Sequence, residues 1–95
     1  MKKVLVKLVD PQGFHARPVT IAVNRLREYD CEGYVFHNGR QESMGSVLGL
    51  LRLGIPCGQT FMIAAEGKDE KEAIFSVVDK MQEIGFLELV EEDVE

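Results

Sequence analysis

A glycine and a proline five residues apart fix where the first helix of this chain begins. Gly13 lets the backbone turn with a positive φ, which residues with a Cβ resist. Within a helix, Pro18 is tolerated in the first turn, where its missing N–H has no intrahelical acceptor in any case. The segment Gly13–Pro18, with the sequence Gly-Phe-His-Ala-Arg-Pro, is therefore expected to be a loop that runs into a helix beginning at about Ala16 or Arg17.

His15 lies directly before the expected start of this helix. The unpaired N–H groups and the partial positive charge at a helix N-terminus disfavour an imidazolium and favour an anion. A neutral imidazole nitrogen can accept a phosphoryl group as a nucleophile, and Arg17 supplies a planar guanidinium that matches phosphate oxygens. We interpret His15 as a phosphorylation site supported by Arg17. The alternative is an ordinary loop histidine beside a helix.

Hydrophobic patterns divide the rest of the chain into short elements. Strands are expected over residues 2–9, 32–37, 40–43 and 60–66, with the hairpin signal Asn38-Gly39 joining the middle two. Helices are expected over residues 16–28, over a short run that begins at Ser46, and from the capping-box pattern of Asp69 and Glu72 to Ile84 and the closing Gly85. The order is βαββαβα. Helical stripes on one side only predict an α+β fold, an open-faced sandwich.

Composition restricts the functions that such a fold can serve. The 95 residues suffice for one core, and the net charge of -5, with acidic residues gathered near the end, argues against nucleic acid as a partner. No apolar run is long enough to span a membrane, so we expect no membrane insertion and a cytoplasmic location. Cys31 and Cys57 are expected to be reduced thiols, and His37 to be structural or solvated. The spacing of histidines and cysteines predicts no metal site.

Two blocks of sequence, Gly13–Pro18 and Ser46–Gly54, carry a resemblance to a known family. With these blocks at this separation, the chain resembles the histidine-containing phosphocarrier (HPr) proteins of the bacterial phosphoenolpyruvate-dependent sugar phosphotransferase system. The resemblance implies an HPr-like domain over residues 1–87. Residues 88–95 extend past the usual end of the family, and their composition predicts an acidic C-terminal tail. The resemblance also implies a four-stranded antiparallel sheet in the spatial order 1-4-2-3, covered on one face by three helices.

The resemblance implies a phosphoprotein that carries a phosphoryl group and is not itself an enzyme. Enzyme I would phosphorylate Nδ1 of His15, Arg17 would steady the phosphate, and the A domain (EIIA) of a sugar permease would receive it in sugar transport. No cofactor is implied. The side chains that would bind these partners are Phe14, Ala16, Thr20, Arg27, Val47, Leu48 and Leu51. From the residues alone, Thr20 and Arg27 on the helix expected over residues 16–28 could equally form a solvated face, and Leu51 could pack beneath the sheet.

Ser46 has two compatible interpretations. Its hydroxyl can cap the short helix, and in the HPr proteins of Gram-positive type the serine at this place is phosphorylated by an ATP-dependent serine kinase/phosphorylase as a regulatory switch. An alternative function is therefore an HPr-like regulatory interaction protein in carbon catabolite control, which binds a transcriptional regulator through Ser46 and the apolar residues beside it. A third possibility is a small binding module that uses Tyr34 and Phe36 on the open sheet face, against which the acidic balance argues. The chain departs from the family pattern at Asn24 and Gly45, where relatives often have lysine.

Overall fold

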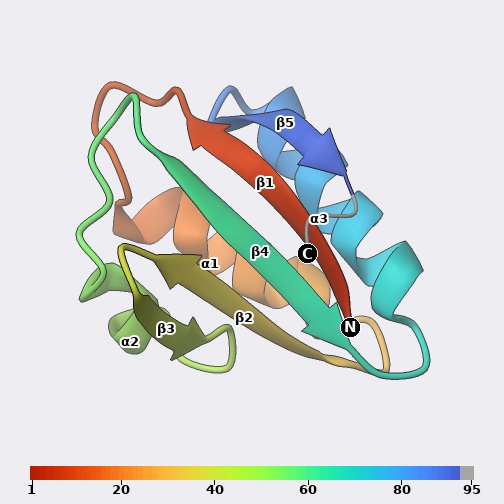
Figure 1. Cartoon of the computed structure of the whole chain (residues 1–95). Coiled ribbons are helices and arrows are strands. Elements are labelled where there is room, and N and C mark those ends of the chain that lie inside the picture. The colour runs from red at the N-terminus through yellow and green to blue at the C-terminus, as the bar shows by residue number, and fades with distance from the viewer. Residues whose placement is uncertain (93–95) are drawn as a thin grey trace.

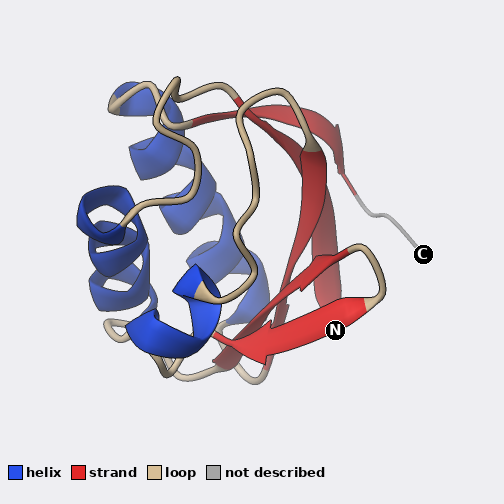
Figure 2. Ribbon diagram, turned by 90° about the vertical axis from the view of Figure 1, so that its left-hand side faces the viewer, coloured by secondary structure: helices blue, strands red, loops and turns tan. Residues whose placement is uncertain are grey.

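Five antiparallel strands form one sheet in the order β3-β2-β4-β1-β5, and three helices cover one of its faces (Figures 1 and 2). This is seen in a computed structural model, which describes residues 1–92. The elements are β1 (Lys2–Leu8), α1 (Ala16–Leu26), β2 (Glu32–His37), β3 (Arg40–Ser43), α2 (Val47–Leu51), β4 (Thr60–Glu66), α3 (Glu70–Glu83) and β5 (Leu87–Glu92). The predicted open-faced α+β architecture is confirmed, and the order 3-2-4-1 is the implied order of the first four strands.

Alternation along the central strands builds the core between the sheet and the helices. Val4, Val6 and Leu8 of β1 are fully buried on the helix-facing side, and Val4 lies opposite Ile63 of β4 in the register. The helices contribute matching apolar stripes, namely Val19, Ala22, Val23 and Leu26 from α1 and Ala73, Ile74, Val77, Val78 and Met81 from α3. Each buried valine or leucine side chain contributes about 1.5 to 3 kcal/mol relative to exposure, so this core holds α1 in place over the sheet.

The fifth strand corrects the expectation of a four-stranded sheet. β5 pairs with the outer edge of β1, placing Leu87 opposite Leu8 and Leu89 opposite Val6. Leu87 is only 1% exposed and belongs to the core. Residues 88–92, expected as part of an acidic tail, form the greater part of this strand, and residues 93–95 of that expected tail lie outside the described residues. As a result, β1 is an inner strand of the sheet.

The capping-box expectation for α3 is wrong in its partners. The Asp69 carboxylate accepts the N–H of Asp30 at 2.8 Å and makes no bond to its own helix. Glu70, rather than Glu72, reaches back and accepts the N–H of Gly67 at 3.2 Å. The Asp69 side chain, which the sequence predicted would cap α3, therefore binds the loop before β2 instead. The other helix termini lie close to expectation: α1 begins at Ala16 and ends at residue 26, and the positive φ of residue 85 follows α3.

Candidate functional site

His15 is the N-cap residue of α1, as predicted. Its backbone is extended, with φ −115° and ψ 167°, and its carbonyl oxygen accepts the N–H of Val19 as the first bond of the helix. The imidazole makes no capping bond to the helix, and the side chain is 31% exposed. The ring is therefore reachable from solvent while the backbone on its C-terminal side is fixed by α1.

Gly13 and Phe14, the two residues before His15, anchor the loop on the core. Gly13 adopts a φ of +72°, and the next residue, Phe14, donates its N–H to the carbonyl oxygen of Ile55 at 3.0 Å. The Phe14 ring packs edge-on against Phe61, with centroids 5.5 Å apart, and lies 5.8 Å from the ring of Phe86. Phe14, expected among the partner-binding residues, is thus half-buried and packs against the core.

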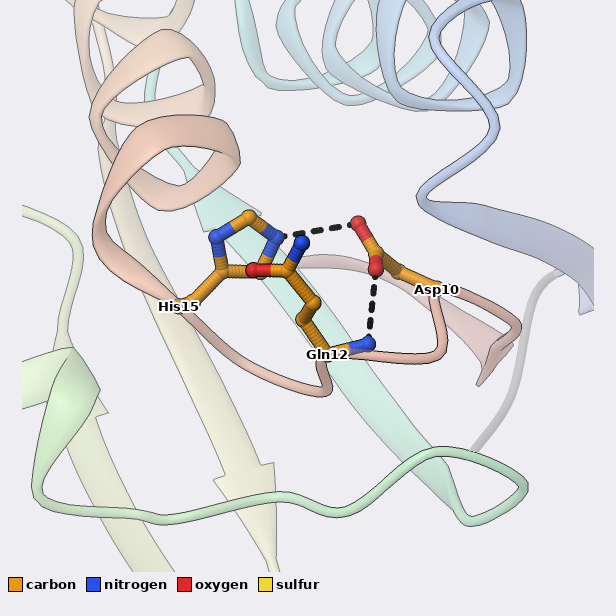
Figure 3. Close-up of polar contacts among 3 residues, drawn as sticks. All are labelled: Asp10, Gln12 and His15. Atoms are coloured by element: carbon orange, nitrogen blue, oxygen red, sulfur yellow. Dashed lines mark hydrogen bonds and ion pairs between the residues drawn. The ribbon is translucent and has the colours of Figure 1, made fainter.

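A carboxylate that sequence reasoning did not single out faces the histidine. Nε2 of His15 lies 3.0 Å from Oδ2 of Asp10, and the other oxygen of that carboxylate accepts the N–H of Gln12 at 2.9 Å (Figure 3). The hydrogen bond with His15, followed by the bond from Gln12, holds the pKa of Asp10 below its ordinary value. The sequence Asp10-Pro11-Gln12 is typical of an Asx turn, but nothing in its spacing from His15 indicates the contact.

Asp10, His15 and Arg17 share a hollow at the surface. The hollow encloses about 260 Å³, and its remaining walls are Pro18, Ile21 and Ile84. Arg17 is exposed, and no hydrogen bond or ion pair from its guanidinium to another described residue is seen. The arrangement offers one nucleophilic ring, one carboxylate and one guanidinium around a space open to solvent, which suits a transferable phosphoryl group. The apolar wall from Ile84, beyond the end of α3, was not predicted.

The second sequence block supplies the short helix α2, which contacts α1. Ser46 caps α2, because its Oγ accepts the N–H of Gly49 at 3.0 Å, and the capping prediction is confirmed. Of the three expected patch residues, Leu48 is 67% exposed, while Val47 and Leu51 are half-buried against the core. The patch therefore presents mainly the Leu48 side chain to solvent.

The remaining candidate residues occupy two kinds of place. Ala16, Thr20 and Arg27 are exposed to solvent along α1 and at its end. The other histidine, His37, is 8% exposed, and its Nε2 lies 2.7 Å from Oε1 of Gln59, which confirms its structural interpretation. Both cysteines are free. Within residues 1–92, no cluster of three or more histidine, cysteine or acidic side chains could hold a metal ion.

Comparisons with known proteins agree with this picture. Residues 2–83 match the family model described as the PTS HPr component phosphorylation site. HPr-C-His from Thermoanaerobacter tengcongensis is 30% identical, with a TM-score of 0.80, over 86% of this chain and 92% of that one. The catabolite repression protein Crh of Bacillus subtilis is 27% identical, with a TM-score of 0.69, over 75% and 82% of the two chains. A Mycoplasma histidine-containing phosphocarrier protein shares the fold, with 22% identity and a TM-score of 0.85, over 90% and 98%. None of the described helices is both long and apolar enough to cross a lipid bilayer.

Proposed function

Because the chain belongs to the HPr family of the phosphotransferase system, we propose that Enzyme I phosphorylates it on Nδ1 of His15 and that it passes the phosphoryl group to the EIIA domain of a sugar permease. The observation that carries this proposal is the placement of His15, half-exposed at the start of α1, in one hollow with Arg17. Such a carrier works in the cytoplasm, where phosphoenolpyruvate charges Enzyme I. It is a substrate of both partners and has no turnover of its own.

The site supplies what phosphoryl exchange requires of a carrier. The ring needs access for a donor on one occasion and for an acceptor on another, and the solvent-open hollow supports both. The guanidinium of Arg17 and the first N–H groups of α1 are donors that can balance the phosphate oxygens. Because Arg17 is exposed on a flexible stem, it can follow the phosphate without locking it, which favours discharge to the next acceptor.

We further propose that partners dock on the face formed by the exposed side of α1 and by α2. Thr20 lies on α1, Arg27 caps the C-terminal end of that helix, and Leu48 projects from α2. An apolar side chain surrounded by polar groups is typical of a surface that another protein covers. Enzyme I and EIIA would both use this face, since each must reach the same histidine.

A second candidate function is regulation through Ser46. The similarity to Crh, described as a catabolite repression HPr, favours it, and the serine is exposed at the start of α2 beside Leu48. Phosphorylation by a serine kinase/phosphorylase would add about two negative charges there. That modified surface would weaken binding to Enzyme I or create a site for a transcriptional regulator.

Phosphorylation with purified components tests the carrier role. Enzyme I and phosphoenolpyruvate should give one acid-labile phosphate on the protein, and the His15→Ala variant should gain none. The matched control is His37→Gln, because His37 is a buried histidine that does not line the hollow, and this variant should be phosphorylated like the wild type. If ATP and a serine kinase gave an acid-stable phosphate on Ser46 while Enzyme I gave nothing, the regulatory function would replace the carrier function.

A further inference from the structure

We propose that Asp10 is a positioning residue for the transfer reaction: its carboxylate holds the His15 ring with the proton on Nε2 and so leaves Nδ1 as the nucleophile. The inference rests on the proposed function of His15, and it adds a residue that neither the loop motif nor the helix start contains. It is carried by the 3.0 Å contact between Nε2 of His15 and Oδ2 of Asp10. In Figure 3 the second ring nitrogen points away from Asp10, on the side of the ring where α1 begins.

The tautomer follows from the chemistry of the two groups. An ionised carboxylate can only accept hydrogen bonds, and the lowered pKa of Asp10 keeps it ionised at neutral pH. Nε2 must therefore donate, which means that it carries the ring proton. A neutral imidazole has a single N–H, so Nδ1 keeps its lone pair.

The carboxylate is itself held in place by the surrounding loop. The N–H of Gln12 donates to Oδ1 at 2.9 Å, and the N–H of Gly13 donates to the carbonyl oxygen of Asp10, also at 2.9 Å. The Asp10 N–H in turn donates to the carbonyl oxygen of Phe86 at 3.2 Å. Since the loop fixes Asp10 and α1 fixes the backbone of His15, the ring is oriented from both sides before a partner arrives.

The charged groups around the His15 ring indicate that Asp10 acts on this ring directly. Of the residues that line the hollow, Asp10 is the anion and Arg17 the cation. The region after α3 contributes Ile84 to the hollow and the ring of Phe86, whose centroid is 6.4 Å from that of His15, and both side chains are apolar. Asp10 is thus the charged group in contact with Nε2, and Arg17 remains available for the phosphate.

The transfer step then needs no proton movement at His15. The lone pair of Nδ1 attacks phosphorus, the Nδ1–P bond forms, and the bond between phosphorus and the donor atom breaks, with that bond's electron pair leaving on the donor. The proton stays on Nε2 throughout. The ring gains positive charge as the Nδ1–P bond forms, and the Asp10 carboxylate compensates that charge across the Nε2–H bond.

A small phosphoryl donor tests this role without any docking partner. With phosphoramidate, the P–N bond breaks, ammonia leaves and one ring nitrogen takes the phosphoryl group. ³¹P NMR then tells which nitrogen was phosphorylated, and ¹⁵N NMR of the unmodified protein tells which nitrogen carries the proton. We expect the wild type to react at Nδ1 and to show the Nε2–H tautomer. In Asp10→Ala, we expect both tautomers and a mixture of Nδ1 and Nε2 products.

Asp10→Asn separates positioning from loop structure. Its amide oxygen can still accept the N–H of Gln12, which leaves the NH₂ group facing Nε2 as a donor, so the turn and the thermal midpoint should persist while the Nδ1–H tautomer gains population. Phosphorylation at Nδ1, by phosphoramidate or by Enzyme I, should slow on the order of tenfold. Asp79→Asn, a change of the same kind on the exposed side of α3, should leave every reading at the wild-type value.

Two results would have different meanings. Wild-type ¹⁵N signals and wild-type Nδ1 selectivity in both Asp10 variants would overturn the role of Asp10, even if Enzyme I phosphorylates the protein normally. Altered tautomers and altered selectivity in the variants, together with no phosphorylation of the wild type by Enzyme I, would leave the role of Asp10 intact and overturn the proposed function.

Discussion

Phe14 and Ile55 join the loop that carries His15 to the loop before β4. The N–H of Phe14 donates to the carbonyl oxygen of Ile55 at 3.0 Å, and the same oxygen lies 3.0 Å from the point where a Cβ on Gly13 would stand. Ile55 itself is 1% exposed, so this oxygen is held by the core and cannot retreat easily. The glycine of the motif is therefore required both by its positive φ and by this close approach.

Gly13→Ala should lower the free energy of unfolding by about 2 to 4 kcal/mol, since the left-handed backbone and the crowding against Ile55 both oppose a Cβ. Gly54→Ala is the matched control, because Gly54 also has a positive φ but meets nothing within 4 Å. It should cost only about 1 to 2 kcal/mol. Urea titrations of the two variants make the comparison, and equal costs would show that the approach of Ile55 is harmless.

Arg17→Ala should leave stability within about 0.5 kcal/mol of the wild type, because the side chain is exposed. Phosphorylation by Enzyme I should slow roughly tenfold or more, as a charged donor to the phosphate is lost. Arg17→Lys should fall between the two, since the charge remains without the planar fork. Lys68→Ala controls for the loss of an exposed cation, because Lys68 follows the end of β4 and does not line the hollow. A rate for Arg17→Ala equal to that of Lys68→Ala would exclude a role at the phosphate.

Leu48 and Leu50 lie two residues apart in α2, but their replacement by alanine should have different effects, one on binding and the other on stability. Leu50→Ala removes a side chain that is 1% exposed and should cost about 2 to 5 kcal/mol of unfolding free energy. Leu48→Ala removes one that is 67% exposed, so stability should hardly change while the dissociation constant for Enzyme I rises. Calorimetric unfolding and titration calorimetry measure the two effects. Unchanged affinity in Leu48→Ala would remove this residue from the docking face.

Ser46→Ala should cost about 1 kcal/mol, since Gly49 loses the oxygen that accepts its N–H. Ser46→Asp keeps an acceptor at the same place and should restore that stability while adding a negative charge beside Leu48. If the serine acts as a switch, the Asp variant should bind Enzyme I more weakly than the Ala variant. Equal affinities for the two variants would mean that Ser46 serves only as a cap.

Leu87→Ala tests whether β5 belongs to the folded core. The leucine is 1% exposed opposite Leu8, so we expect a loss of about 2 to 4 kcal/mol in urea unfolding. Val90→Ala, in the same strand but 53% exposed, should have almost no effect. Equal midpoints for the two variants would argue that β5 adds nothing to stability.

Local patterns predicted most of the fold because the contacts that decide it are local. The hairpin between β2 and β3 follows from Asn38 and Gly39, which both adopt the positive φ that such a turn requires. β5 escaped prediction because its alternation is broken. Leu87 and Leu89 lie opposite Leu8 and Val6, but the pairing with β1 shifts between Leu5 and Val6, so Val90 has no partner in the register and is exposed. Three apolar residues in an acidic run gave no strand signal without the neighbouring strand.

The site divided in a similar way between local and distant information. His15 and the start of α1 were predictable from the short range effects of glycine and proline. The contact with Asp10 was not, because it depends on a turn held by the carbonyl oxygen of Phe86, a residue more than 70 positions along the chain. Ile84, which also lines the hollow, is likewise far from His15 in the sequence, so its place there was not predictable from local patterns.

The pairing of β5 with β1 determines when the sheet can be completed during synthesis. Residues from the two ends of the chain are neighbours in one sheet, as Leu8 and Leu87 show. During synthesis, this edge of β1 stays unpaired until residues 87–92 have left the ribosome. Closure of the sheet is therefore a late step, and for that interval the nascent protein depends on its other contacts to avoid pairing with a second chain.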